Sequence, residues 1–387
     1  MALGRGCVTV TPVTSPRTSP STTATPLGPV SAIVDGGDMD CGSGLLLLIT
    51  RAMRRLEPGD LLAVRSAEAS VTTDLPAWAD LVGHTVASET AETGSGPWWF
   101  AVRKKGAGEA TVDSLVPGGS GTVFSVGDRT PLGTRLWAYT NFDCNLACLY
   151  CCAESSPRAD ARRLDPGLAR AVFAEFAEQG GRELFLTGGE PFMHPDLGEL
   201  VAAGQGLSRT ILTNAMVFGR GRRRELLERL DRSVVLQVSL DSATAEGHDA
   251  QRGAGSWARA MAGISLAKEL GFRVRIAATM LDEDPPAVAA LHRLLDAEGI
   301  AEADRVIRPV AQEGFADHGM HVSLDTLEPE PTITNDGAWW HPVAVTDPHM
   351  RIADAPLPLS EVFGVVRDIL AVQGAAAASG REVFRCA

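Results

Sequence analysis

The sequence predicts an α/β protein in which a small two-layer α/β sandwich precedes a larger unit of alternating strands and helices. Three observations support this fold class. Segments in the order β-α-β-α-β-β occupy residues 30–103, six strand–helix repeats follow within residues 134–310, and a stretch rich in Gly and Pro separates the two. Regular strand–helix alternation indicates a parallel sheet, curled or open, that binds ligands at the carboxyl ends of its strands.

Length, charge and composition narrow the function classes. A chain of 387 residues suggests two or three domains. The net charge of −13 argues against non-specific binding to nucleic acid. Apolar runs such as Leu45–Ile49 are far shorter than the roughly 18 residues of a membrane span. With no recognisable secretory signal and too few cysteines for a disulfide scaffold, we expect a cytoplasmic protein that binds neither nucleic acid nor membrane.

The first part of the chain contains a tail and a small unit. Residues 1–28 are rich in Thr, Ser and Pro and are predicted to be a disordered tail. Residues 29–105 form the sandwich. Its expected strands are 31–35, 61–65, 85–89 and 98–103, and its helices are 44–56 and 74–83, the second with Pro76 in its first turn.

Residues 106–133 are predicted to be a linker with one strand-like piece at 122–126, and residues 134–326 to be the repeat unit. The expected strands are 134–140, 183–186, 209–212, 234–239, 273–280 and 304–310. The expected helices are 166–179, 196–204, 220–230, 257–270 and 285–298. The helix at 166–179 has the clearest start, because Asp165 suits the N-cap and Pro166 the first helical position.

The C-terminal part, residues 327–387, is less regular. Asn335-Asp336-Gly337 predicts the turn of a hairpin between strands 332–334 and 338–343, and residues 358–372 predict an amphipathic helix.

Three cysteines follow the first strand of the repeat unit. Cys144, Cys148 and Cys151 are spaced by four and three residues, so one loop can turn all three toward a common centre. A zinc site would need a fourth ligand, and adjacent Cys152 is poorly placed to supply it. A [4Fe–4S] cluster held by three cysteines leaves one iron open, and unligated buried thiols are the remaining alternative. The spacing favours an iron–sulfur cluster.

The cysteine spacing, with Tyr150 just before the last cysteine and a (β/α)6 pattern around it, resembles the radical S-adenosylmethionine (radical SAM) superfamily. The resemblance covers residues 134–310. It implies a partial (β/α)6 TIM-type barrel in which the three cysteines hold a [4Fe–4S] cluster. The open iron would then bind S-adenosylmethionine.

Motifs at the ends of the next strands resemble the segments that bind S-adenosylmethionine in this superfamily. Gly188-Gly189-Glu190-Pro191 resembles the motif that holds the methionine ammonium, for which a carboxylate is chemically suited. The resemblance implies that the cofactor contacts are Tyr150, Gly188, Gly189, Glu190, Pro191, Thr213, Asn214, Ser239, Asp241 and Arg252. Arg252 is the candidate for the methionine carboxylate, and Ser239 and Asp241 are candidates for ribose or methionine.

The sandwich resembles the small sulfur-carrier (TusA-like) family. The segment from Asp35 to Gly44, followed by an apolar helix, carries Cys41 at the position of that family's persulfide cysteine. A helix N-terminus lowers a thiol pKa, whereas Asp38 and Asp40 would raise it. The family's Cys-Pro pair is replaced here by Cys41-Gly42. We expect an accessible, reactive Cys41 that accepts sulfur from a cysteine desulfurase, or alternatively a docking module with a buried Cys41.

The C-terminal hairpin resembles a degenerate SPASM or twitch extension. Together, the resemblances imply an enzyme that cleaves S-adenosylmethionine reductively, using an electron from a donor such as flavodoxin or ferredoxin. The resulting 5′-deoxyadenosyl radical would modify an unknown peptide or small-molecule substrate, with a possible link to sulfur chemistry. The alternative is a sulfur-relay protein in which Cys41 is the active part and the barrel is a scaffold.

Overall fold

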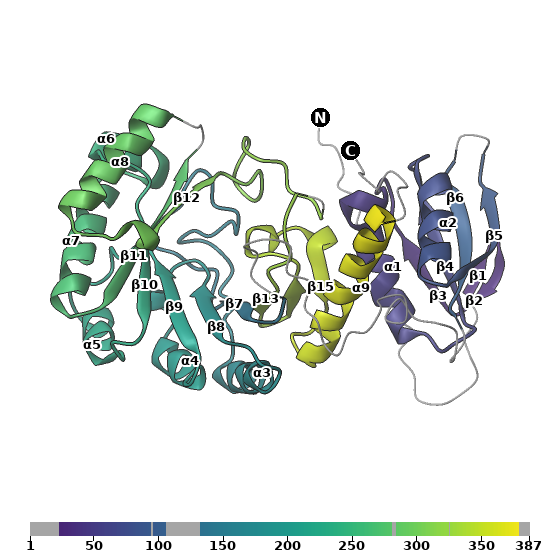
Figure 1. Ribbon diagram of the computed structural model, residues 1–387, viewed down its shortest axis with the longest axis horizontal. Coiled ribbons are helices and arrows are strands. Elements are labelled where there is room, and N and C mark those ends of the chain that lie inside the picture. Colours follow the sequence, from purple (N-terminus) through teal and green to yellow (C-terminus); the bar gives the residue numbers. More distant parts are fainter. Residues whose placement is uncertain (1–22, 94–95, 106–131, 281–283, 325, 379–387) are drawn as a thin grey trace. The chain divides into compact units, whose positions relative to one another are not determined.

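The structure, a computed structural model, describes residues 23–93, 96–105, 132–280, 284–324 and 326–378 (Figure 1). The chain divides into two compact units. The first consists of residues 1–122, 323–328 and 364–387, and the second of residues 123–322 and 329–363. The strand expected at 122–126 lies outside the described residues. Within the described part, no helix combines the length and the apolar character needed to cross a membrane.

The first unit contains a four-stranded sheet. Its strands are β3 (Ala32–Asp35), β4 (Leu61–Ser66), β5 (Thr85–Ala91) and β6 (Trp98–Arg103), in the order β3-β4-β6-β5. β3 and β4 are parallel, and the other two pairs are antiparallel. These strands and the helices between them follow the β-α-β-α-β-β order that the sequence predicts.

Two helices share a hydrophobic core with this sheet. A π-helical segment, Cys41–Leu45, leads into α1 (Leu46–Arg55), and α2 (Val71–Leu81) follows β4. Val71, Leu75 and Trp78 are buried in the core at helical spacing. This apolar face begins a turn earlier than predicted. Pro76 therefore lies inside α2 and not in its first turn, which corrects the expectation.

Part of the predicted disordered tail is ordered. β1 (Thr23–Thr25) and β2 (Gly28–Val30) pair as an antiparallel ribbon. The turn is closed by a hydrogen bond from Thr25 Oγ1 to the Gly28 carbonyl at 2.8 Å. Gly28 has a φ of 93°, which favours glycine. The prediction of disorder is therefore wrong for residues 23–28, because a Thr/Pro composition also suits a short ribbon with a tight turn.

The second unit is built on a nine-stranded sheet in the order β12-β11-β10-β9-β8-β7-β13-β14-β15. Its strands are β7 (Arg135–Tyr139), β8 (Glu183–Thr187), β9 (Ser208–Thr213), β10 (Val235–Ser239), β11 (Arg273–Met280), β12 (Arg305–Pro309), β13 (Thr332–Thr334), β14 (Gly337–Trp339) and β15 (Arg351–Ala353). β7 to β12 are parallel and adjacent in chain order. The α/β class is confirmed. The sheet is mixed and does not close, and the partial-barrel shape stays a prediction.

Helices connect the parallel strands, and in Figure 1 α3, α4, α5 and α7 lie along one side of them. The helices of the second unit are α3 (Pro166–Glu178), α4 (Leu197–Ala203), α5 (Arg222–Arg229), α6 (Ala245–Arg252), α7 (Ser256–Glu269) and α8 (Pro285–Ala297). α9 (Leu359–Ala378) follows β15, and from Gly364 onward it belongs to the first unit. The sequence did not predict α6. This helix buries only His248 and has no apolar face, so hydrophobic periodicity cannot reveal it.

The C-terminal hairpin extends the same sheet beyond β7. β13 pairs in parallel with β7 and antiparallel with β14. Trp339 and Trp340 are buried, as packing residues of the hairpin should be. The second strand is shorter than predicted because a 3-10 turn, Pro342–Ala344, replaces its end. The carboxyl ends of β7, β8, β9 and β10 therefore share one edge of an extended sheet.

The start of α3 provides a test of helix capping. The Asp165 carboxylate accepts a hydrogen bond from the Leu168 amide at 2.8 Å, whereas Asp284, at the matching Asp-Pro start of α8, makes no such bond. Asp165→Ala should lower the free energy of unfolding by about 1 kcal/mol. Asp284→Ala should lower the free energy of unfolding by clearly less than Asp165→Ala does. Equal losses in denaturant unfolding would show that the Asp165 cap contributes nothing specific.

Candidate cofactor site

The cysteine loop connects β7 to the segment before α3. Cys144 is buried, and Cys148 and Cys151 are partly exposed. Backbone amides point at two of the sulfurs, with Leu146 N 3.4 Å from Cys144 Sγ and Ser155 N 3.3 Å from Cys151 Sγ. N–H groups aimed at sulfur stabilise thiolates, the form in which cysteine binds metal. The loop is therefore prepared to hold charged sulfur ligands.

The electrostatics of this loop disfavour thiolates without a bound cation. Burial raises the pKa of the Cys144 thiol well above its usual range, and neighbouring Glu190 raises it further. Burial likewise raises the pKa of Cys148 to about 11, although Arg252 opposes the shift. Iron supplies the positive charge that this site lacks and deprotonates coordinating thiols. The donor set thus fits a cationic metal group.

The spacing of the ligands bears on the kind of metal group. Across the ranges that the structure describes, no three Cys, His, Asp or Glu side chains converge closely enough to share one metal ion. In a [4Fe–4S] cluster each cysteine binds a different iron, so the thiolates stand farther apart than the ligands of a single zinc ion.

The Gly188-Gly189 segment at the end of β8 lies directly against the start of the cysteine loop. The Gly189 amide donates to the Asn141 carbonyl at 2.8 Å, and the Glu190 amide donates to the Asp143 carbonyl at 3.0 Å. A Cβ atom on Gly189 would lie 2.2 Å from the Asp143 carbonyl oxygen. These glycines permit close approach of backbone to backbone. They position the cysteine loop.

The Glu190 carboxylate is buried among hydrogen-bond donors. It accepts from Thr213 Oγ1 at 2.8 Å, from the Asn214 amide at 2.9 Å and from the Phe192 amide at 3.1 Å. Burial raises the pKa of Glu190 to about 7, although these three hydrogen bonds lower it. Glu190 therefore joins the ends of β8 and β9, and as a buried carboxylate it is suited to a cationic partner.

A second charged group follows β10. Arg252 in α6 pairs with Asp241, with Nε 2.5 Å from Oδ2, and Tyr150 of the cysteine loop donates its hydroxyl to the same carboxylate. Burial acts to raise the pKa of Asp241, but Arg252, Tyr150 and the Thr279 amide together leave this pKa lowered. The Arg252 guanidinium lies 5.5 Å from the centre of the Tyr150 ring. This group ties the cysteine loop to β10.

The structure places the remaining predicted contacts at the same edge of the sheet. Pro191 is buried at the start of a 3-10 turn after β8, and Asn214 donates its side-chain amide to Asn145 of the cysteine loop at 2.8 Å. Ser239 is the half-buried last residue of β10. The predicted contacts thus follow β8, β9 and β10 and meet the loop that follows β7.

Three positioning residues escaped the sequence analysis. Asn141 donates its side-chain amide to the Glu190 carbonyl at 3.1 Å, and His248 Nδ1 accepts from the Asp241 amide at 3.2 Å. The Thr279 amide donates to Asp241 at 3.0 Å. Asn141, directly after a strand end, could have been found by its position. Backbone donors such as Thr279 leave no trace in a sequence.

Cys41 does not have the predicted accessibility. Its side chain is fully buried, in the same core as Leu45 and Leu75. The expectation of an exposed thiol at a helix start is wrong, because the segment Cys41–Leu45 turns this side chain into the core before α1 begins. The position of Cys41 beside a helix start suggested an exposed side chain, but packing in the core of the first unit buries it.

The comparisons with known proteins agree with this geometry. Residues 140–295 match the family model of the radical SAM superfamily. Relatives include an AdoMet-dependent heme synthase of Methanosarcina barkeri, 34% identical over 35% of this chain and 40% of that protein. The subtilosin biosynthesis protein AlbA of Bacillus subtilis is 31% identical over 36% of this chain and 32% of AlbA. The mycofactocin maturase MftC of Mycobacterium ulcerans is 35% identical over 35% of this chain and 36% of MftC.

Among solved structures, anSMEcpe with bound AdoMet aligns at a TM-score of 0.49 and 11% identity, covering 62% of this chain and 83% of anSMEcpe. Streptococcus suis SuiB bound to S-adenosylmethionine aligns at a TM-score of 0.42 and 18% identity, covering 49% of this chain and 44% of SuiB.

The geometry of the site agrees with the family match, in which residues 140–295 are similar to the radical SAM superfamily. Members of this superfamily use a [4Fe–4S] cluster and S-adenosylmethionine. The chain spans less than half the length of the curated relatives named above.

The contact between Gly189 and the cysteine loop predicts a strong effect of one methyl group. Gly189→Ala should lower the free energy of unfolding of the metal-free protein by about 1–3 kcal/mol, because the loop backbone must move away. Gly219→Ala is the control, since a Cβ at Gly219 meets nothing within 4 Å. Urea unfolding measures both. Equal stability of the two variants would contradict the packing described here.

Proposed function

We propose that this protein is an enzyme that cleaves S-adenosylmethionine reductively and uses the 5′-deoxyadenosyl radical to modify a substrate. One observation carries the proposal. The loop with Cys144, Cys148 and Cys151 lies at the sheet edge where buried Glu190 and the Asp241–Arg252 pair also lie. Three thiols, a carboxylate suited to an ammonium and a buried ion pair make a coherent site for a cluster and this cofactor.

Each group has a proposed role. Cys144, Cys148 and Cys151 hold the cluster, which when bound supplies the electron that breaks the sulfonium bond. Glu190 accepts hydrogen bonds from the methionine ammonium, and Arg252 donates to the methionine carboxylate. Since Arg252 is already paired with Asp241, the carboxylate must share this guanidinium with Asp241. The five donors of a guanidinium allow such sharing.

The other predicted contacts would complete the cofactor site. Tyr150 holds Asp241 in place, and Thr213 and Asn214 hold Glu190. The half-buried backbone around Gly188 and the Ser239 hydroxyl are proposed to contact the methionine and ribose portions. A positioned site of this kind orients reactants and excludes water around a reactive intermediate.

The substrate is proposed to be a peptide or a small molecule of cofactor biosynthesis. Relatives of this chain are named for several kinds of product: AlbA for biosynthesis of the bacteriocin subtilosin, MftC for maturation of mycofactocin, and others for synthesis of heme or, in Drosophila melanogaster, of the molybdenum cofactor. An external one-electron donor such as flavodoxin or ferredoxin is part of the proposal.

Sulfur transfer is not part of the proposal. A persulfide carrier must present its sulfur to a cysteine desulfurase and to an acceptor, whereas Cys41 has no exposed surface. The burial of Cys41 favours the docking-module interpretation of the first unit over the TusA-like sulfur carrier.

The ligand assignment is testable by metal analysis. Anaerobic reconstitution should load about four irons and four sulfides per chain. Cys144→Ala, Cys148→Ala and Cys151→Ala should each abolish that loading. Cys152→Ala is the matched control: its half-buried side chain interacts with Tyr139 at the end of β7, and its loss should leave the iron count intact. Iron retained in Cys151→Ala but lost in Cys152→Ala would show that the wrong cysteine was assigned.

The role of Glu190 is testable by binding. Glu190→Gln should weaken S-adenosylmethionine affinity about ten-fold or more, because a charge-assisted hydrogen bond is worth about 1.5–3 kcal/mol. Calorimetry with the reconstituted protein measures the affinity, and the iron count should stay at the wild-type level. Unchanged affinity would remove Glu190 from the cofactor site. Loss of iron as well would assign it to supporting the loop.

A further inference from the structure

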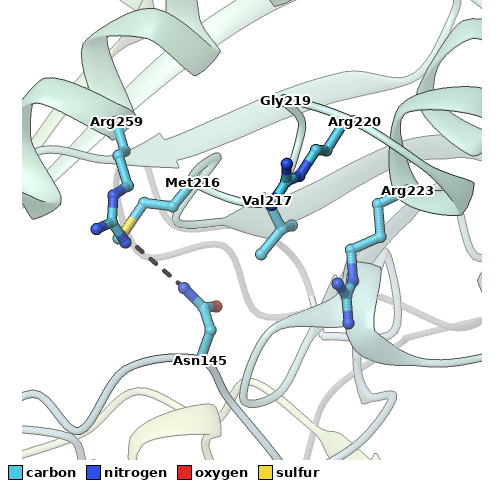
Figure 2. A pocket seen from close by; sticks show the side chains of 7 residues that line it. All are labelled: Asn145, Met216, Val217, Gly219, Arg220, Arg223 and Arg259. Carbon is cyan, nitrogen blue, oxygen red and sulfur yellow. Dashed lines mark hydrogen bonds between the residues drawn. The ribbon is translucent and has the colours of Figure 1, made fainter.

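A pocket of about 500 Å³ lies beside the cysteine loop. Residues that follow β9 form part of its wall. Figure 2 shows its lining: Asn145, Met216, Val217, Gly219, Arg220, Arg223 and Arg259. We call it the arginine pocket. Asn145 directly follows Cys144 and donates its side-chain amide to Met216 Sδ at 3.9 Å. The pocket therefore begins one residue away from a proposed cluster ligand.

The three arginines of the pocket form no ion pair with any described carboxylate, although Arg223 is close enough to Glu190 to lower the pKa of that carboxyl. Within the described ranges, none of Arg220, Arg223 and Arg259 forms an ion pair or a side-chain hydrogen bond. The neighbouring Arg224, by contrast, pairs with Glu228 at 2.6 Å. In a chain with a net charge of −13, three unpaired guanidinium groups around one hollow form a local positive field.

The helices beside the pocket add to this field. Arg223 lies in the first turn of α5, and Arg259 lies in the first turn of α7. A cation at a helix N-terminus opposes the helix dipole, whose positive end is there. Glu225 and Asp249 offset part of this unfavourable interaction. Asp249 does so by accepting hydrogen bonds from the backbone amides of Gly255 and Trp257. Arginines at helix N-termini repel the helix dipoles when the surface is free. A bound anion would remove this repulsion, so the arrangement favours an anionic partner.

The exposure of these side chains favours a macromolecular partner. All three arginines are exposed, and the lining contains no buried charged group that would enclose a small ligand. Small-molecule sites usually bury most of their ligand. Weak electron-transfer complexes instead use small, open interfaces steered by opposite charge.

We propose that the arginine pocket docks an acidic one-electron donor protein against the cysteine loop. This inference rests on the proposed function, which requires one electron from outside, and electron transfer requires the donor group to come close to its acceptor. The donor gives up one electron and the cysteine-bound acceptor takes it up. A fully reduced flavin, as the hydroquinone anion, loses one electron to become the neutral semiquinone, so no proton is released. The acidic face of the donor then replaces the missing carboxylate partners.

The test uses fully reduced flavodoxin as the donor and the reconstituted protein. Calorimetry at low salt should show a complex, and Arg220→Gln/Arg223→Gln/Arg259→Gln should weaken it at least about ten-fold. Salt should weaken the wild-type complex and have little effect on the triple variant. Arg223→Gln alone should weaken binding, while the adjacent control Arg224→Gln, which removes a paired arginine of the same helix, should not.

A second readout separates this inference from the proposed function. Electron uptake from flavodoxin, followed by stopped-flow absorbance, should slow in the triple variant, while reduction by methyl viologen radical, a small cation, should not. The docking proposal would be overturned if the wild-type protein formed no complex with flavodoxin. It would also be overturned if Arg223→Gln and Arg224→Gln lowered the affinity for flavodoxin equally. Tight binding of inorganic phosphate that depends on the three arginines, without any change in flavodoxin binding, would overturn it as well. Viologen-driven cleavage of S-adenosylmethionine tests the proposed function independently of docking.

Discussion

The candidate site depends on one constraint, the backbone contact between the Gly188-Gly189 segment and the start of the cysteine loop. Two amide–carbonyl hydrogen bonds and the absence of side chains bring β8 and the residues after β7 together. Glu190, the next residue, then connects to β9 through Thr213 and Asn214. The loop that holds the cysteines is thus anchored on a rigid sheet edge, which keeps the three thiols in a defined position.

A second connection completes the arrangement. Tyr150 and Arg252 both bind Asp241, so the far end of the cysteine loop is attached to β10 and α6. The loop is thus held at its start by backbone hydrogen bonds and at its far end by buried charged groups that have partners. Such groups lose much of their stability when one member is removed, because the remaining charge is left buried. The same residues therefore serve the fold of the loop and the proposed binding of the cofactor.

Much of this organisation could be predicted from the sequence. The strands and most helices of the second unit show clear periodicity, and the cysteine spacing with the motifs after β8, β9 and β10 predicted one site. What could not be predicted depends on tertiary packing. The polar helix α6 has no apolar face, and the burial of Cys41 is decided by a core assembled from distant residues. The arginine pocket joins residues 220, 223 and 259, whose proximity no local pattern reveals.

The central claim is that this site cleaves S-adenosylmethionine reductively. The most direct measurement is the formation of 5′-deoxyadenosine by the anaerobically reconstituted wild-type protein, with methyl viologen radical as the reductant. The account predicts 5′-deoxyadenosine that requires reductant and iron, and that is absent from Cys148→Ala treated identically. Full iron loading and S-adenosylmethionine binding without any 5′-deoxyadenosine would contradict it.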